Sequence, residues 1–339
     1  MSGVMKALVL QRPGEIVLET RAIPEPGLHD VLVRVHRVGV CGSDVHYYTH
    51  GKIGPFVVES PLVLGHEMAG VIERVGASVR SRSVGQRVAV EPGIPDRICD
   101  WCRAGRYNLC PNVQFMATPP VDGAFAEYVI VPEDFAYPLP DNVSLDEGAM
   151  MEPLSVAVYA AHRSGLRPGQ TVIVLGAGPI GLLTLQVARA AGAGSIGVVD
   201  INANRLKLAH SLGATQTVDA GNGDLVGQAD VVFDCAGSAK TAAMAVHLAE
   251  RGGKVTMIGL PPEDNFPYPL VAAMAKEIDI VTVFRYANVY PSSIALVAQG
   301  RVDVKALVTH RFSLERAEEA LVLSHRRTDN VVKAMIDVS

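Results

Sequence analysis

The chain has 339 residues, of which 49% are hydrophobic, and this length and composition predict two domains with a full core in each. The 30 lysine and arginine residues and 35 aspartate and glutamate residues form no basic block, which argues against nucleic acid or an anionic membrane as a partner. The N-terminus lacks the apolar core of a signal peptide, and no apolar run reaches transmembrane length. Five cysteines are too few for a disulfide framework, so we expect a soluble, cytoplasmic protein.

Strand-like runs separated by turns make up the first 131 residues. Valines alternate with charged residues between residues 30 and 38, which is typical of a half-buried strand. Few segments have the length and apolar spacing of a helix. We therefore predict a β-rich, barrel-like first domain, with strands at residues 5–10, 16–19, 30–38, 68–75, 87–91 and 126–131.

Strands and helices alternate from residue 171 to about residue 284, after a helical pattern at residues 145–165. This alternation is typical of a doubly wound parallel sheet, so the expected fold class is α/β. The apolar runs predict a helix at residues 239–251 and strands at residues 171–175, 196–199, 231–235, 254–258 and 278–284.

The C-terminal tail has predicted helices at residues 292–299 and 314–324 and a closing strand at residues 333–337. Because we expect the six strands of the parallel sheet to be complete by residue 284, we assign the tail to the first domain. The predicted domains are therefore residues 1–153 with 285–339, and residues 154–284.

A glycine-rich turn follows the predicted strand at residues 171–175 and opens a helix. Gly176 allows a tight turn, Gly178 lets the backbone approach a pyrophosphate, and Gly181 lets the helix pack on the strand. Asp200 ends the next strand, 19 residues past Gly181, where an acid can bind the ribose hydroxyls. A structural turn is the alternative, but all parts of a dinucleotide site occur at the right distances. An aspartate here would repel a 2′-phosphate, which favours NAD over NADP.

A set of metal-binding side chains lies in the first domain: Cys41, His66, Glu67 and Glu152. Three protein ligands and an open position are typical of a catalytic zinc. However, a single cysteine in an apolar stretch is usually a small core residue. Neighbours in a regular strand also face opposite sides, so His66 and Glu67 could share an ion only on irregular backbone, which Gly65 would allow. The residues alone leave both interpretations open.

A second set is Cys99, Cys102 and Cys110 in a polar, loop-like stretch. A Cys-x2-Cys pair with a third cysteine nearby indicates a structural tetrahedral zinc, and three unrelated buried thiols are not expected in so polar a segment. Asp96 precedes Cys99 by three residues and is the predicted fourth ligand. A carboxylate and three thiolates should bind zinc more weakly than four thiolates.

The chain resembles the zinc-dependent medium-chain dehydrogenases and, within them, the polyol (sorbitol and xylitol) dehydrogenases. The resemblance runs nearly end to end and is carried by CGSDVHYYTHGKIGPFVVESPLVLGHEMAG, CRAGRYNLCP, GAFAEYV, MEPLSVAVYA, LGAGPIGLL and VFRYANVYP. It implies a GroES-like catalytic domain and a Rossmann domain that binds NAD. It also implies zinc-dependent oxidation of a polyol secondary alcohol to a ketose, with hydride transfer to NAD, and a homotetramer, since relatives are commonly tetramers.

The resemblance also implies roles for single residues. Cys41, His66 and Glu67 would hold the catalytic zinc with a water, and Glu152 would contact the water or the metal, so which glutamate binds the metal stays open. Asp44 would orient the histidine ligand. A proton relay would use Ser43 and His46, and the polyol site would be lined by Tyr47, Arg285 and Tyr286. The implied NAD contacts, besides the glycine-rich turn, are Ile180, Asp200, Arg205, Ile258, Gly259, Leu260, Val283, Phe284 and Arg285.

Asp96 departs from the family pattern, because many relatives have a cysteine there. Animal sorbitol dehydrogenases lack the whole four-ligand site, so its loss would not undermine the catalytic interpretation. Two other functions stay open: a related enzyme that acts on threonine or an aldose, and a sensor that binds NAD without catalysis. A sensor would be free to lose its metal ligands, whereas this chain has all four.

Overall fold

The computed structural model describes residues 3–222, 227–261 and 265–338, which group by their contacts into two compact units. Unit 1 comprises Met1–Glu152 and Val308–Ser339, and unit 2 comprises Pro153–Leu307. Each unit has a hydrophobic core of its own. Within the described ranges, no helix is both long and apolar enough to cross a bilayer.

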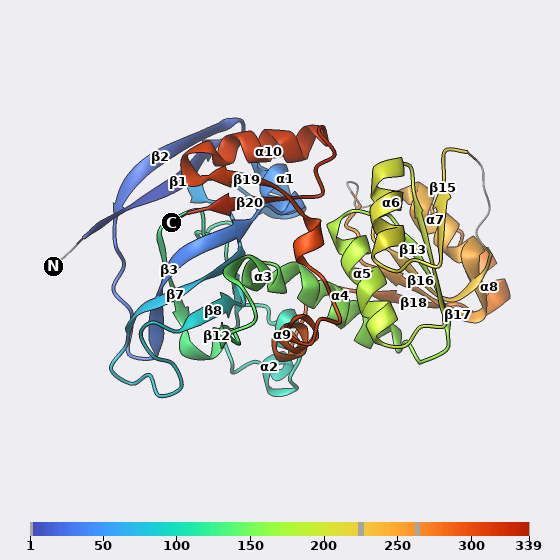
Figure 1. The fold of residues 1–339 in the computed structure, drawn as a ribbon, viewed down its shortest axis with the longest axis horizontal. Coiled ribbons are helices and arrows are strands. Elements are labelled where there is room, and N and C mark those ends of the chain that lie inside the picture. The colour runs from blue at the N-terminus through green and yellow to red at the C-terminus, as the bar shows by residue number, and fades with distance from the viewer. Residues whose placement is uncertain (1–2, 223–226, 262–264, 339) are drawn as a thin grey trace. The chain divides into compact units, whose positions relative to one another are not determined.

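Unit 1 is built on a seven-stranded sheet around β3 (Asp30–Gly39), which pairs antiparallel with three other strands (Figure 1). The order is β12–β8–β7–β3–β20–β19, and β11 also pairs with β3. The valines of β3 that the alternation marked as inward-facing are fully buried. The other strands are β7 (Glu67–Val75), β8 (Arg87–Val90), β11 (Tyr128–Pro132), β12 (Ala136–Pro138), β19 (Val308–Ser313) and β20 (Lys333–Asp337).

A second sheet of three strands shares this core. β1 (Val4–Arg12) pairs antiparallel with β2 (Glu15–Ala22) and with β6 (Leu62–Val63). The helix α10 packs against β19 and β20. The remaining elements of unit 1 are short: β4 (Lys52–Ile53), β5 (Phe56–Val57), β9 (Gly93–Ile94), β10 (Gln114–Phe115), α1 (Gly42–His50), α2 (Asp100–Arg103), α3 (Leu145–Ala149) and α10 (Ala317–Arg326).

Unit 2 contains a six-stranded parallel sheet in the order β15–β14–β13–β16–β17–β18. From the central strand β13 the chain builds outwards first through β14 and then, on the other side, through β16. The strand order reverses between β13 and β16. In such sheets, ligands bind at the carboxyl ends of the strands at this point. The strands are β13 (Thr171–Leu175), β14 (Ser195–Asp200), β15 (Gln216–Asp219), β16 (Ala229–Asp234), β17 (Ala249–Met257) and β18 (Asp279–Thr282).

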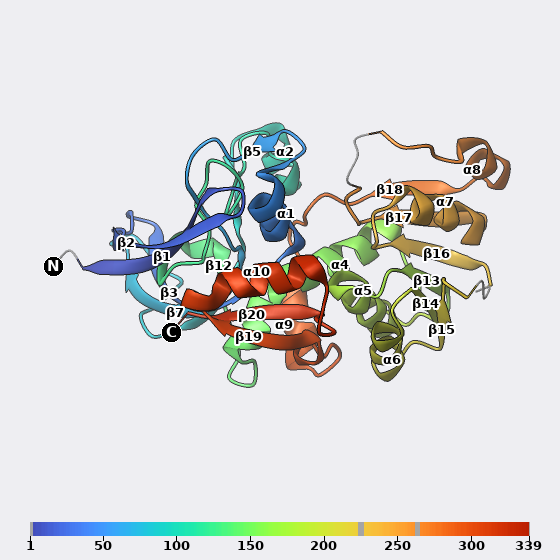
Figure 2. The same ribbon diagram turned by 90° about the horizontal axis from the view of Figure 1, so that it is seen from above.

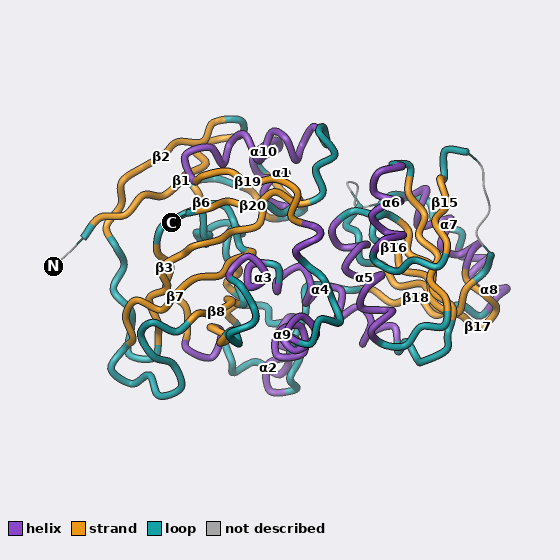
Figure 3. Tube along the Cα trace, viewed as in Figure 1, coloured by secondary structure: helices purple, strands orange, loops and turns teal. Residues whose placement is uncertain are grey.

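Helices connect the strands of unit 2. α5 packs against β13 and β14, and α7 and α8 pack against β17 (Figure 2). Figure 3 shows the contrast between the units: strands and loops predominate in unit 1, whereas strands alternate with helices in unit 2. The helices are α4 (Met151–Ser164), α5 (Pro179–Ala190), α6 (Ala203–Ser211), α7 (Ala239–Leu248), α8 (Leu270–Lys276) and α9 (Tyr290–Ala298).

The predicted fold class, a β-rich unit and a doubly wound parallel sheet, is confirmed. Several element boundaries differ from the predicted ones, two of them with a clear cause. The predicted helix at residues 239–251 ends at Leu248, because residues 249–251 already belong to β17. The predicted buried strand at residues 278–284 is the four-residue edge strand β18, which is largely exposed. The sequence did not predict five further elements: α1, α6, α8, β15 and β19. They are short, and most are too polar to show a clear periodic spacing of apolar residues.

Residues 285–307, assigned from the sequence to the first domain, group by their contacts with unit 2. The hydroxyl of Ser293 on α9 lies 3.0 Å from that of Ser155 on α4. The side-chain amide of Gln186 on α5 accepts a hydrogen bond from Asp303 N (2.7 Å) and donates one to Asp303 O (3.1 Å). These contacts join positions more than a hundred residues apart, which a periodic pattern does not reveal.

Candidate metal centre and cofactor site

The carboxylate of Asp44 braces the two loops that carry Cys41 and His66. Asp44 is fully buried on α1, and its Oδ2 accepts the N–H of Cys41, the residue before the helix, at 2.9 Å. Its Oδ1 accepts the N–H of Gly65 at 2.9 Å and lies 3.6 Å from His66 Nδ1. One side chain therefore fixes both loops and orients the imidazole.

Gly65 provides the irregular backbone that a shared ion would require. It has a φ of 85°, and a Cβ on it would press against the Phe125 ring. His66 thus precedes β7, whose first residue is Glu67, and the strict alternation of strand faces does not apply to this pair.

Cys41, His66 and Glu67 form a cluster whose ligand atoms all lie within 4.8 Å of one another; His66 and Glu67 are buried and Cys41 is partly buried. Burial alone would lower the pKa of His66, but the charges of Asp44 and Cys41 raise it well above its usual value. The pocket is therefore rich in negative charge, which a divalent cation would balance. Thiolate, imidazole and carboxylate are also the donor types that zinc prefers, so the residues fit the metal.

Two further charged groups adjoin this cluster. Lys333, 3% exposed on β20, donates to both carboxylate oxygens of Glu67 at 2.7 Å. Glu152 is buried near the start of α4 and interacts electrostatically with Lys333. Burial alone would lower the pKa of Lys333, but Glu67, Cys41 and Glu152 raise it, so the lysine is a cation. Lys333 was not predicted from the sequence, where its only signal was a lysine opening an apolar strand.

The predicted relay and substrate residues of unit 1 lie on α1. Ser43 is partly buried, Tyr47 is buried and His46 lies at the surface. Partial burial lowers the pKa of His46, and the charge of the nearby His50 lowers it further. The neutral imidazole, which can accept a proton, is therefore favoured.

The second predicted metal set also comes together. Among the described residues, the ligand atoms of Asp96, Cys99, Cys102 and Cys110 lie within 4.8 Å of one another. Asp96 Oδ1 accepts the N–H of Cys99 at 3.0 Å, and Asn112 donates to Oδ2 at 2.8 Å. These hydrogen bonds hold the pKa of Asp96 well below its ordinary value, so the carboxylate is ionised and faces the thiols.

A buried acid that the sequence analysis missed, Glu91, anchors this lobe to the sheet. It follows β8 and accepts hydrogen bonds from the hydroxyls of Tyr107 (2.7 Å) and Tyr137 (3.0 Å). Burial raises the pKa of Glu91 to about 7, although the two hydrogen bonds act in the opposite direction. Glu91 is 2% exposed, and its only sequence signal was an acid ending an apolar strand.

In unit 2 the glycine-rich turn connects β13 to α5. Gly176 has a φ of 93°, and a Cβ on Gly181 would overlap the carbonyl oxygen of Gly176. Gly178 is the residue before α5, and no side chain caps the N-terminus of this helix. A Cβ added to Gly178 would have no atom within 4 Å. The open first turn offers N–H groups to an anion. Asp200 accepts the N–H of Ala177 at 2.6 Å, which holds the acid beside the turn.

The other predicted NAD contacts lie on three elements of unit 2. Ile180 is on α5, and the N–H of Arg205 on α6 donates to the Asn202 side chain at 3.1 Å. Ile258, Gly259 and Leu260 follow β17, and the N–H groups of Ile258 and Gly259 each donate to Asp234 O at 2.9 Å.

Val283, Phe284, Arg285 and Tyr286 follow β18. The Arg285 guanidinium lies 4.8 Å from the centre of the Phe284 ring, and Tyr286 is buried. The joint role of Arg285, Tyr286 and Tyr47 in one substrate site stays a prediction.

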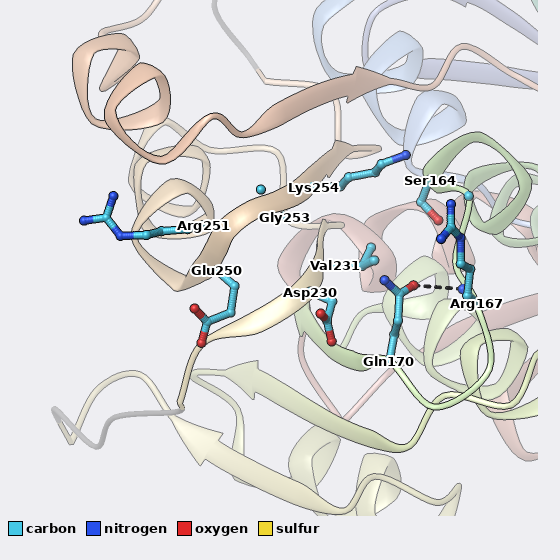
Figure 4. Close-up of a pocket in the computed structure, with 11 residues that line it drawn as sticks. Ser164, Arg167, Gln170, Asp230, Val231, Glu250, Arg251, Gly253 and Lys254 are labelled. Atoms are coloured by element: carbon cyan, nitrogen blue, oxygen red, sulfur yellow. Dashed lines mark hydrogen bonds between the residues drawn. The ribbon is translucent and has the colours of Figure 1, made fainter.

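A polar cavity in unit 2 coincides with none of these residues. It lies towards the amino ends of β13 and β16 and the adjoining part of β17, away from their carboxyl ends (Figure 4). Charged and polar side chains line it, among them Arg167, Gln170, Asp230, Glu250 and Lys254. Asp230 is held by Thr171, whose backbone N–H and hydroxyl donate to it at 2.7 Å, and the mixed charges favour no particular ligand.

The metal-type cluster and the dinucleotide-type turn are the two sites expected of a metal-dependent, nucleotide-dependent dehydrogenase. Residues 27–141 match the alcohol dehydrogenase GroES-like domain, and residues 179–299 match the zinc-binding dehydrogenase domain. The chain therefore belongs to the zinc-binding dehydrogenase family, and the resemblance to its polyol dehydrogenase group is confirmed.

Its relatives include sorbitol dehydrogenases. The Bacillus subtilis enzyme is 43% identical over 98% of this chain and 97% of its own length. The Arabidopsis thaliana enzyme is 46% identical over 93% of this chain and 90% of its own length. An Escherichia coli oxidoreductase/dehydrogenase of unknown specificity, ECK1772, has a similar solved structure, with a TM-score of 0.94 at 39% identity over 99% of this chain and 100% of that one.

Replacing Asp44 by Asn should weaken zinc binding about 10–100-fold and destabilise the metal-free protein by about 2–3 kcal/mol. The amide cannot accept from both Cys41 N and Gly65 N, so one buried donor loses its partner. Competition with a chromophoric chelator and urea unfolding measure the two effects. The control is Asp337→Asn, which alters a partly exposed ion pair and should change neither quantity appreciably. Zinc affinity within threefold of wild type in Asp44→Asn would contradict this role.

The two glycines of the turn should respond differently to alanine. Gly181→Ala should destabilise the protein by about 1–3 kcal/mol, because its Cβ meets the Gly176 backbone. Gly178→Ala should leave the stability nearly unchanged but weaken NADH binding, because its methyl group enters the space a pyrophosphate would use. Urea unfolding and fluorescence titration with NADH test this. If Gly178→Ala binds NADH as tightly as wild type, the turn does not hold the cofactor.

Glu91 should make stability fall as the pH rises. Its folded pKa of about 7 exceeds the ordinary 4.5, so the folded state binds more protons than the unfolded state between these values. Its contribution is present below pH 4.5 and is lost as the pH rises to about 7. Relative to Glu91→Gln, the metal-free wild type should therefore lose about 2 kcal/mol between pH 5 and pH 8. Urea unfolding at a series of pH values measures both free energies of unfolding. If they change with pH by the same amount in wild type and in Glu91→Gln, Glu91 does not titrate in this way.

Proposed function

We propose that the chain oxidises a secondary alcohol of a polyol, such as xylitol or D-sorbitol, to the ketose and transfers hydride to NAD. The observation that carries the proposal is the cluster of Cys41, His66 and Glu67 that Asp44 holds together. Relatives named sorbitol dehydrogenases, 43–46% identical over most of the chain, support the polyol as the substrate.

Zinc bound at this cluster would act as a Lewis acid that lowers the pKa of the substrate hydroxyl. The side chains of the chain would do the rest. Asp44 keeps His66 in one orientation, Ser43 and His46 pass the hydroxyl proton towards solvent, and the low pKa of His46 suits it to accept that proton near neutral pH. His66 and Glu67 are buried, and burial strengthens the electrostatic interactions that these side chains make.

NAD is the proposed cofactor, rather than NADP. Asp200 is fixed beside the glycine-rich turn by the N–H of Ala177, and its other oxygen accepts the N–H of Asn202 at 2.8 Å. A carboxylate held there can bind ribose hydroxyls and repels a 2′-phosphate.

We also propose a second, structural zinc bound by Asp96, Cys99, Cys102 and Cys110. The ionised Asp96 and the convergence of the three thiols support it. Metal analysis should then give two zinc ions per chain, and Cys102→Ser should reduce this to one.

The proposed assembly is a homotetramer in the cytoplasm. Leu270, Val271 and Met274 expose apolar side chains on α8, and β18 is an edge strand of its sheet, so unit 2 has a surface suited to self-association. The five cysteines are free thiols, as thiolate ligands in a reducing compartment require. Light scattering should give about four times the chain mass of 36.0 kDa, and cell fractionation tests the compartment.

The central test is NADH formation from NAD with xylitol, D-sorbitol, threonine or glucose, with and without a strong zinc chelator. We expect chelator-sensitive oxidation of the polyols. Cys41→Ser should lower it more than about 1,000-fold and leave NADH affinity unchanged, because Cys41 belongs to the metal cluster in unit 1.

The matched control is Cys235→Ser in unit 2, a cysteine with no proposed role, which should keep most of the activity. Activity on threonine or glucose alone would move the chain to another substrate class. A chain that binds NADH and oxidises none of the four would be a sensor, and the proposal would be wrong.

A further inference from the structure

Asp234 is a fully buried acid at the carboxyl end of β16, and no step of the proposed reaction uses it. In the sheet, Asp234 pairs with Leu175 of β13 on one side and with Met257 of β17 on the other. It therefore lies where the strand order reverses and where both neighbouring strands end. Ligands of doubly wound sheets bind at this point, so a residue here can organise the turns that form the binding site.

The side chain of Asp234 holds the turn that follows it. Its Oδ1 accepts the N–H of Ala236 at 3.0 Å and that of Gly237 at 3.3 Å. Its Oδ2 lies 3.2 Å from the hydroxyl oxygen of Thr241, in the first turn of α7. A buried carboxylate requires such partners, and these partners fix the turn between β16 and α7.

The main chain of Asp234 holds the turn after β17. Its carbonyl oxygen accepts the N–H groups of Ile258 and Gly259, each at 2.9 Å. The two turns are also in backbone contact. A Cβ on Gly237, whose φ is 66°, would meet the carbonyl carbon of Gly259 at 2.6 Å, and a Cβ on Gly259 would overlap the backbone nitrogen of Gly237. Only glycines allow this approach, so a displacement of the first turn would move the second.

These two turns lie on the side of the sheet where the nicotinamide half of the proposed cofactor would bind. A doubly wound sheet consists of two mononucleotide-binding halves, and a dinucleotide crosses from one to the other at the reversal. Asp200 ends β14 and is the proposed partner of the adenosine ribose, which assigns the adenosine half to the β14 side. The nicotinamide half would then lie on the side of β16 and β17, next to the turns that Asp234 holds.

We propose that Asp234 is a positioning residue for the nicotinamide half of NAD. Its carboxylate is buried and acts through the turns after β16 and β17 rather than by contact with the cofactor. The inference rests on the proposed use of NAD, and it deepens that proposal by assigning the shape of the nicotinamide site to one buried acid. Removing the carboxylate frees the first turn, so affinity for the whole dinucleotide should fall while affinity for its adenosine half should not.

The experiment compares the dissociation constants of NADH and AMP by isothermal titration calorimetry, on variants that circular dichroism shows to be folded. AMP is the probe for the adenosine half alone. Asp234→Ala should bind NADH about tenfold more weakly than wild type does, and AMP within about threefold of wild type. Asp234→Asn keeps an oxygen that can accept from Ala236 and Gly237, so it should bind both ligands within about threefold of wild type.

The matched control is Asp230→Ala, at the other end of the same strand. Asp230 likewise accepts a backbone N–H and a threonine hydroxyl, both from Thr171 at 2.7 Å. Its removal should leave the ratio of the two dissociation constants unchanged. Gly237→Ala is the second variant if Asp234→Ala does not fold. Its methyl group would separate the two turns with Asp234 in place, so it should also weaken binding of NADH about tenfold relative to AMP.

A folded Asp234→Ala variant that binds NADH as tightly as wild type would overturn the inference. An equal loss of affinity for NADH and AMP would also overturn it, because it indicates a general structural role. A loss in Asp234→Asn as large as that in Asp234→Ala would contradict the role of the hydrogen bonds. These results leave the proposed function intact if the wild type binds NADH and oxidises polyols. If the wild type binds no NADH, the inference and the proposed use of NAD both fail.

Discussion

The site depends on one buried carboxylate. Asp44 ties the backbone of Cys41 to that of Gly65, two loops separated by more than twenty residues, and also faces His66. Its position follows from its place in the first turn of α1, where an acid can accept the N–H of the residue before the helix. The sheet brings β3 and β7 together, and Asp44 determines how the loops at their ends are arranged.

Several acidic side chains lie near this carboxylate, and Lys333 is a buried cation that pairs with one of them. Cys41 and Glu67 belong to the metal-type cluster that Asp44 adjoins, and Lys333 is a buried ammonium that meets Glu67 across the gap left by Gly39. A divalent metal at the cluster would supply further positive charge.

Much of this organisation could be predicted from the sequence, because it rests on local signals. The turn from Gly176 to Gly181, the acid at Asp200 and the Cys99–Cys102 spacing lie within short stretches with known physical requirements. Lys333 and Glu91 could not be predicted, since Lys333 meets Glu67 only through the sheet register, and the two tyrosines that bond Glu91 lie in separate elements 16 and 46 residues further along the chain. The grouping of α9 with unit 2 was hidden for the same reason: Ser293 and Asp303 find their partners on α4 and α5.

The most direct test of the account is a crystal structure of the zinc-loaded protein, with anomalous diffraction recorded at the zinc absorption edge. We predict an anomalous peak within bonding distance of Cys41 Sγ and His66, in the cluster that also contains Glu67. No peak at Cys41, in a crystal of protein that oxidises polyols, would contradict the central claim that this cluster is the metal site.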